Sequence, residues 1–172
     1  MRYFPVLLIL GSTPAVAHAQ LPTQVGQDAY AAIAEIVRLL DQDKSTDWSK
    51  VNLEVLRQHL IDMNEVTLHA SVAQTPLPDG LQMDVTGEGR TRDAIRRMLA
   101  AHGPALDALP EYRASVEQLP DGMRLTVRAR RLGDAAGVTR IRGLGFIGLL
   151  TVGAHHQMHH LALARGEGMD HH

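Results

Sequence analysis

The sequence LPDGLQMDV, residues 77–85, recurs later in the chain as LPDGMRLTV, residues 119–127. Each copy follows a similar short segment, ASVAQ at 70–74 and ASVEQ at 114–118, and the first copy carries an additional Thr-Pro between its two parts. In both copies Pro-Asp-Gly separates two runs in which apolar and polar residues alternate. Proline presets φ and glycine accepts the left-handed conformation, so this tripeptide favours a tight turn. Each copy is therefore predicted to form a β-hairpin.

Strand alternation predicts that the two hairpins share one apolar face. Alternate positions along the four strands are apolar and would point to the same side of a sheet. These positions are Leu68, Ala70, Val72, Leu81, Met83, Val85, Tyr112, Ala114, Val116, Met123, Leu125, Val127 and Ala129. The opposite side would carry polar residues, including His69, Arg124 and Arg128. A four-stranded antiparallel sheet with one apolar face requires helices to cover that face.

Helical periodicity appears before, between and after the hairpins. Apolar residues at i, i+3 and i+4 spacing predict one helix over residues 28–40 and a second before the first hairpin. A third helix would begin near Thr91 and end or kink at Gly103-Pro104, and a long last helix would cover residues 138–164. The apolar positions of the first three helices are Tyr30, Ile33, Val37 and Leu40; Leu53, Leu56, Leu60 and Met63; and Ile95, Met98 and Leu99.

The predicted fold is therefore α+β. Two helix-plus-β-hairpin repeats would form a four-stranded antiparallel sheet, with one face covered by helices that include the long C-terminal helix. Residues 20–165 would form a single domain, and residues 166–172 a flexible tail that contains histidines. Glycines 143, 145, 148 and 153 would give the last helix a smooth face, against which the alanine-rich first helix could pack closely.

The N-terminal residues have the features of a secretory signal peptide. Arg2 precedes an apolar run at residues 3–10, and small residues follow at the positions that signal cleavage requires. Residues 1–19 are predicted to be removed by cleavage after Ala19, although cleavage after Ala17 would also fit and would expose His18. The protein is therefore expected to be exported to the periplasm. It contains no cysteine, which excludes disulfides and thiolate metal ligands.

The last predicted helix ends in the histidine-rich segment AHHQMHHL, residues 154–161. Residues at i and i+4 share a helix face, so His155 would lie above His159 and His156 above His160, with Met158 beside the first pair. Imidazole is the commonest biological metal ligand, and thioether sulfur selects reduced copper. This segment is therefore predicted to bind a metal ion, with copper favoured and zinc or nickel next.

Two further histidines are candidate ligands from neighbouring helices. His59 forms an i, i+4 pair with Met63, and His102 forms one with Met98. Asp62 could orient His59. The alternatives without a metal are that His102 caps the end of its helix and that both methionines fill the core. The complete set of predicted ligands is His155, His156, Met158, His159, His160, His59 and His102.

Charge is divided between two parts of the chain. Acidic residues prevail in residues 20–89 and arginines in residues 90–142. The arginine-rich part could bind an anionic partner, but mutual neutralisation of the two parts is preferred. Nucleic acid is a poor candidate partner, because the compartment is wrong and aromatic residues are scarce. No segment has the length and apolar character of a transmembrane helix.

These features predict a periplasmic metal-binding protein that acts in metal storage, delivery or tolerance rather than in catalysis. One alternative is a metal-free interaction module of the cell envelope that uses the polar, arginine-rich sheet face with Arg124 and Arg128. A metal-dependent hydrolase is less favoured, since no His-Glu-x-x-His motif supplies a base. Non-covalent haem held by histidines is a subordinate possibility, because Cys-x-x-Cys-His is lacking.

Overall fold

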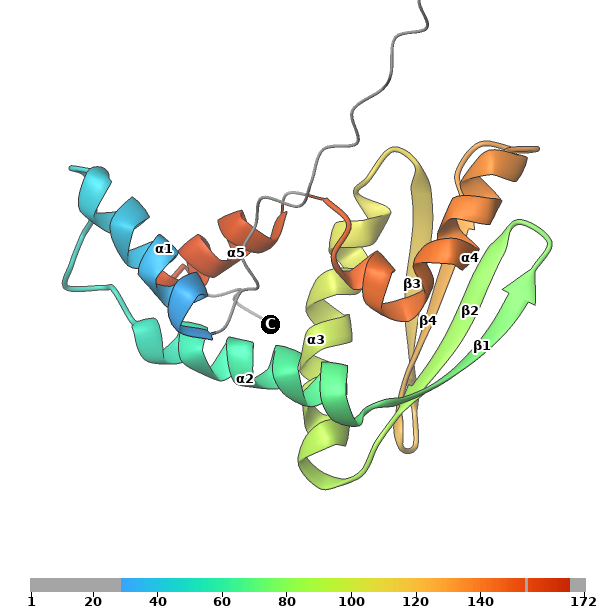
Figure 1. Cartoon of the computed structure of the whole chain (residues 1–172), viewed down its shortest axis with the longest axis horizontal. Helices are drawn as coiled ribbons and strands as arrows, with labels where there is room; N and C mark the ends of the chain where they lie inside the picture. Colours follow the sequence, from blue (N-terminus) through green and yellow to red (C-terminus); the bar gives the residue numbers. More distant parts are fainter. Residues whose placement is uncertain (1–28, 154, 168–172) are drawn as a thin grey trace, which may run out of the picture.

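The computed structural model describes residues 29–153 and 155–167, apart from the side chains of residues 155–157. Its elements are α1 Ala29–Gln42, α2 Leu53–His69, β1 Ser71–Leu77, β2 Gly80–Thr86, α3 Gly89–Asp107, β3 Tyr112–Leu119, β4 Gly122–Ala129, α4 Ala135–Leu150 and α5 His155–Ala164. Figure 1 shows α3 and α4 against the sheet, and α1, α5 and the first part of α2 as a separate helical lobe. The predicted α+β class is confirmed. The predicted signal peptide and residues 168–172, with His171 and His172, lie outside the described residues.

The sheet consists of the two predicted hairpins joined along their second strands. Its strand order is β1-β2-β4-β3, and every neighbouring pair is antiparallel. Gly80 lies opposite Arg128, and Gly122 lies opposite Thr86. A Cβ at Gly80 would lie 2.0 Å from the carbonyl oxygen of Val127, and one at Gly122 would lie 1.9 Å from that of Val85. The glycines of the two Pro-Asp-Gly turns therefore allow β2 and β4 to pair closely. The duplication of a whole helix-plus-hairpin unit stays a prediction.

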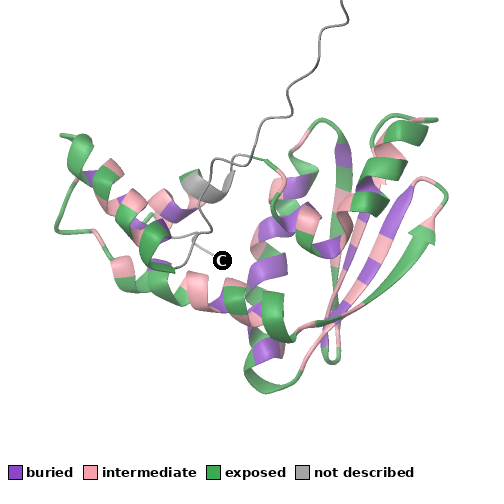
Figure 2. Ribbon diagram, viewed as in Figure 1, coloured by how far each residue is buried: buried purple, intermediate pink, exposed green. Residues whose placement is uncertain are grey.

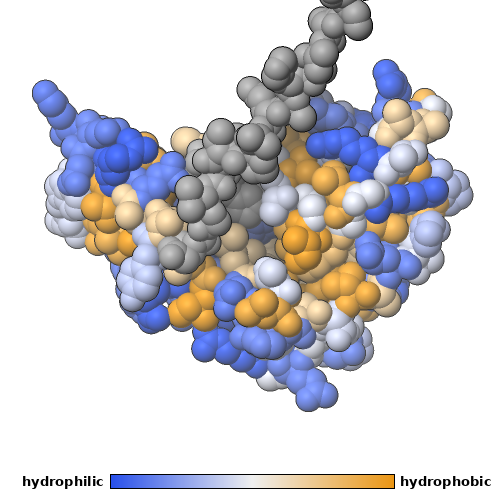
Figure 3. All heavy atoms as spheres, viewed as in Figure 1, coloured by the Kyte–Doolittle hydropathy of each residue, from blue (hydrophilic) through white to orange (hydrophobic). Residues whose placement is uncertain are grey.

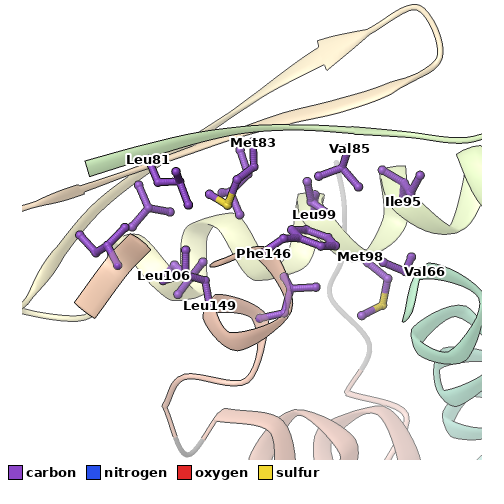
Figure 4. Close-up of a cluster of buried hydrophobic side chains, with 14 of the residues drawn as sticks. Val66, Leu81, Met83, Val85, Ile95, Met98, Leu99, Leu106, Phe146 and Leu149 are labelled. Carbon is purple, nitrogen blue, oxygen red and sulfur yellow. The ribbon is translucent and has the colours of Figure 1, made fainter. Parts of the chain in front are cut away.

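The main core lies between the sheet and helices α3 and α4. Figure 4 shows β2 residues on one side of this core, facing Leu99 and Leu106 of α3 and Phe146 and Leu149 of α4. The buried strand residues are Leu81, Met83, Val85, Tyr112, Leu125 and Val127, all from the predicted apolar face. Leu68 is the exception. It belongs to the last turn of α2 and is 64% exposed, because that helix continues to His69 and the strand begins only at Ser71.

Two arginines on the outer face of the sheet form ion pairs with acidic residues of the first hairpin. Arg124 donates two hydrogen bonds to Asp84, at 2.6 and 2.7 Å, and Arg128 pairs with Asp79. The hydrogen bonds and charge of Arg124 hold the pKa of Asp84 below its usual range, although partial burial acts in the opposite direction. Both pairs join the acidic part of the sequence to the basic part, which agrees with the preferred interpretation of the charge pattern.

A second, smaller hydrophobic cluster holds the helical lobe together. It contains Ile36 and Leu40 of α1, Leu56 of α2 and Ala164 of α5. Figure 2 shows buried positions along the inner side of α1. Tyr30, predicted to belong to the apolar stripe, is instead 85% exposed. The helix buries the row formed by positions 32, 36 and 40, and position 30 lies on another face.

The prediction of a single long C-terminal helix over residues 138–164 is wrong. The segment forms α4 and α5, separated by a short connection. Within α4, Gly145 has φ 57° and ψ −164°, and Gly153 in the connection has φ 92°. Glycine adopts such angles readily, whereas other residues do not, so these positions interrupt the helix. Gly145 lies against the side chain of Gln74 in β1. The hypothesis of a smooth glycine face required it to lie against the first helix instead.

The end of α3 and the start of the predicted tail differ from the prediction. Helix α3 continues through Gly103-Pro104 to Asp107, so those residues do not end it. A Cβ at position 103 would lie 2.6 Å from a methyl carbon of Val116, which shows how closely α3 approaches β3. Helix α5 ends where the amides of Gly166 and Glu167 donate to the carbonyl oxygens of Leu163 and Ala162. The predicted tail therefore has its first two residues fixed to α5.

The face shown in Figure 3 carries hydrophobic residues in separate patches among hydrophilic ones, and the outer end of the helical lobe is hydrophilic. Across residues 29–153 and 155–167, no helix has both the length and the apolar character needed to cross a membrane.

Candidate metal centre

Three helices bring four histidines together at the junction between the helical lobe and the main core. His59 comes from α2, His102 from α3, and His159 and His160 from α5. The ring centroid of His59 lies 4.7 Å from that of His159, 5.3 Å from that of His160 and 6.2 Å from that of His102. The centroids of His102 and His159 are 6.2 Å apart, and those of His159 and His160 are 6.3 Å apart. All four belong to the predicted ligand set.

The spacing of these rings suits a bound transition-metal ion. With a metal–nitrogen bond of about 2.0–2.1 Å, an imidazole centroid lies about 3.2 Å from the ion. The point equidistant from the centroids of His59, His102 and His159 lies about 3.4 Å from each, and for His59, His159 and His160 the value is about 3.2 Å. In each of these two sets of three rings, the spacing of the centroids therefore matches that of imidazoles around one ion.

The nitrogen atoms are not already arranged around one point. Within the part of the chain that the structure describes, no group of three or more His, Cys, Asp or Glu side chains is placed so that it could hold a metal ion. The rings of His59 and His102 are parallel to within 1°, so their nitrogen atoms do not converge. Rotation about the side-chain bonds would be needed, and the outer torsion of histidine has a broad energy well. The cluster is therefore a candidate metal centre. The distances between its rings fit a bound ion better than the orientations of the rings do.

His102 is held in a defined orientation inside α3. Its side chain is buried, with 2% exposed, and its Nδ1 lies 2.9 Å from the carbonyl oxygen of Met98. A carbonyl oxygen can only accept, so Nδ1 carries the proton and the lone pair of the neutral ring is on Nε2. Metal-binding histidines are commonly oriented in this way. His102 lies inside α3, which ends at Asp107, so the alternative that it caps the helix end is wrong.

Asp62 lies beside the cluster and is held by an arginine. Its carboxylate accepts hydrogen bonds from Arg97 at 2.7 and 3.0 Å and one from Gln58 at 3.3 Å. Burial alone would raise the pKa of Asp62, but the hydrogen bonds and charge of Arg97 outweigh it and the pKa lies below its usual range. The prediction that Asp62 orients His59 did not anticipate this pairing. The opposite charges of Asp62 and Arg97 on neighbouring predicted helices were the sequence signal that could have indicated this ion pair.

The predicted sulfur ligands lie apart from the imidazoles. Met158 is 67% exposed on α5, and Met98 is buried in the main core, where Figure 4 shows it beside Val66. Met63 packs against the same core. Among the described side chains, the candidate metal ligands are therefore the four imidazole rings. The side chains of His155 and His156 lie outside the described residues.

A groove of about 540 Å³ opens beside two of the histidines. It runs between α2 and α3 and reaches α5. Its lining residues are Val55, Gln58, His59, Asp62, Arg96, Arg97, Ala100, Ala101, His159 and Leu163. The sequence pattern did not predict this groove, because the groove depends on how residues of three separate helices pack together.

The chain matches no known protein-family model, no curated protein and no solved structure. Its function therefore has to be inferred from the histidine cluster and the surroundings of that cluster.

Proposed function

We propose that the protein binds a divalent transition-metal ion through His59, His102, His159 and His160. The observation that carries this proposal is the convergence of four imidazoles from three helices, with five centroid distances between 4.7 and 6.3 Å. Protonated rings so close together would repel one another, whereas a shared ion stabilises them.

Copper(II) is the favoured ion, with zinc or nickel next. Imidazole suits all three, and among divalent first-row metals copper(II) generally binds most tightly to a given set of nitrogen ligands. Reduced copper would favour sulfur ligands, but Met158 is largely exposed and Met98 belongs to the core. The donor set therefore supports the oxidised form of the ion.

Storage, delivery or tolerance of the metal in the periplasm is the proposed role. The signal-peptide features of residues 1–19 support export. A hydrolytic role would need a base that can accept a proton from metal-bound water. Asp62 is poorly suited to this task, since Arg97 engages both of its oxygens and its pKa is lowered.

The test is copper titration of the full chain at neutral pH, followed by metal analysis after gel filtration. Wild type should retain close to one ion per chain, and the double variant His59→Ala/His159→Ala should lose it. Both replaced rings are only half buried, which limits the effect on folding. His69→Ala is the matched control, because His69 is an exposed histidine of α2 that pairs with Glu65. Equal copper retention by wild type and the double variant would contradict the assignment.

A further inference from the structure

The groove between α2 and α3 adjoins the proposed ion on one side only. His59 and His159 form part of its wall and have the closest pair of ring centroids, 4.7 Å apart. His102 and His160, both more than nine-tenths buried, are not among its lining residues. An ion held by the cluster would therefore have a coordination position facing this groove.

The rest of the wall is mainly apolar. Val55 of α2, Leu163 of α5, and Ala100 and Ala101 of α3 contribute hydrocarbon surface. The two alanines leave space that larger side chains would fill. A volume of about 540 Å³ lies within the usual range for sites that bind small organic molecules.

The charge of the lining favours an anion. Arg97 is compensated by Asp62, whereas Arg96 adds a further positive charge; its described hydrogen bond goes to the carbonyl oxygen of Pro120. A divalent ion bound by neutral imidazoles would increase the positive charge. A carboxylate would reduce it and is also a metal ligand.

We propose that the groove binds a small organic carboxylate with an apolar body. Its carboxylate ligates the ion on the side of His59 and His159, and its body packs between Val55, Ala100 and Leu163. This inference rests on the proposed metal-binding function.

Titration of the copper-loaded full chain with phenylacetate, acetate and benzyl alcohol tests this proposal, with the visible absorption of copper(II) as the readout. Phenylacetate should bind at least about tenfold more tightly than acetate, because it buries an aromatic ring. Benzyl alcohol, which lacks the carboxylate, should leave the spectrum unchanged.

Ala100→Phe should fill the groove and abolish the preference for phenylacetate without weakening copper binding. Ala136→Phe is the matched control, since Ala136 is also an exposed helical alanine but lies on α4, outside the groove. It should behave as wild type. Equal affinities for phenylacetate and acetate, or an unchanged preference in Ala100→Phe, would overturn the groove proposal alone. Failure of wild type to bind copper would overturn both proposals.

Discussion

At the scale of single residues, the hydrogen bond to Met98 determines which tautomer the neutral ring of His102 adopts. In metal-free protein the neutral ring of His102 should carry its hydrogen on Nδ1, because the carbonyl oxygen cannot donate. Nitrogen-15 chemical shifts of the imidazoles distinguish the two tautomers. On addition of copper(II) the His102 signals should broaden, while those of the exposed His69 remain visible. A resting tautomer with hydrogen on Nε2 would rule out this orientation.

Asp62 should contribute stability that depends on pH. Its pKa is lower in the folded protein than in the unfolded chain, where about 3.9 is usual, so its contribution is present above that value. It is lost as the pH falls through the folded-state pKa. Asp62→Asn should lower the free energy of unfolding by about 1–3 kcal/mol at pH 7, and the difference should shrink below pH 4. Urea unfolding of both proteins at pH 7 and pH 3 measures this, and a constant difference would contradict it.

Residue spacing predicted part of the candidate site. Helical periodicity placed His159 and His160 on neighbouring positions of one helix and identified His59 and His102 as partners, and the structure brings these four together. Periodicity could not show which face of the last helix meets the other helices. Met158 was therefore included although its side chain is exposed.

At the scale of secondary-structure elements, the kink within α4 depends on glycine. Gly145 has φ 57° and ψ −164°, a conformation that almost only glycine adopts. Gly145→Ala should therefore lower the free energy of unfolding by about 1–3 kcal/mol. Gly143→Ala is the control within the same helix, because a Cβ there meets nothing within 4 Å. It should be neutral or stabilise the protein by about 0.5–1 kcal/mol, since alanine favours helix. Thermal unfolding measures both, and equal effects would refute the distinction.

The hairpins and the last helix show why some elements could be predicted and others could not. A β-turn depends on neighbouring residues, so Pro-Asp-Gly was sufficient to locate both hairpins. The course of a glycine-rich helix depends on what it packs against. Gly145 contacts Gln74 of β1, and such a long-range contact leaves no local pattern in the sequence.

At the scale of the whole molecule, the histidine cluster joins two separate hydrophobic clusters. The helical lobe buries Ile36, Leu40, Leu56 and Ala164, whereas the main core is formed by α3, α4 and the sheet with Val66 of α2. The second half of α5 is tied to the lobe by Ala164, whose carbonyl oxygen accepts from the amide of Asn52 at 2.7 Å. The middle of α5 carries His159 and His160, which face His59 and His102. A bound ion would therefore fasten α5 to the main core.

Copper(II) should consequently stabilise the folded protein and protect α5 in particular. At a free ion concentration a hundredfold above Kd, the free energy of unfolding should rise by up to about 2.7 kcal/mol, and binding of copper to histidines of the unfolded chain reduces this value. Amide hydrogen exchange should slow over residues 155–164 and change little in β3 and β4, which already pair along their full length. In His59→Ala/His159→Ala both effects should disappear, whereas His69→Ala should keep them. If copper slowed exchange equally throughout the chain, or left α5 unchanged, the ion would not be the link between α5 and the main core.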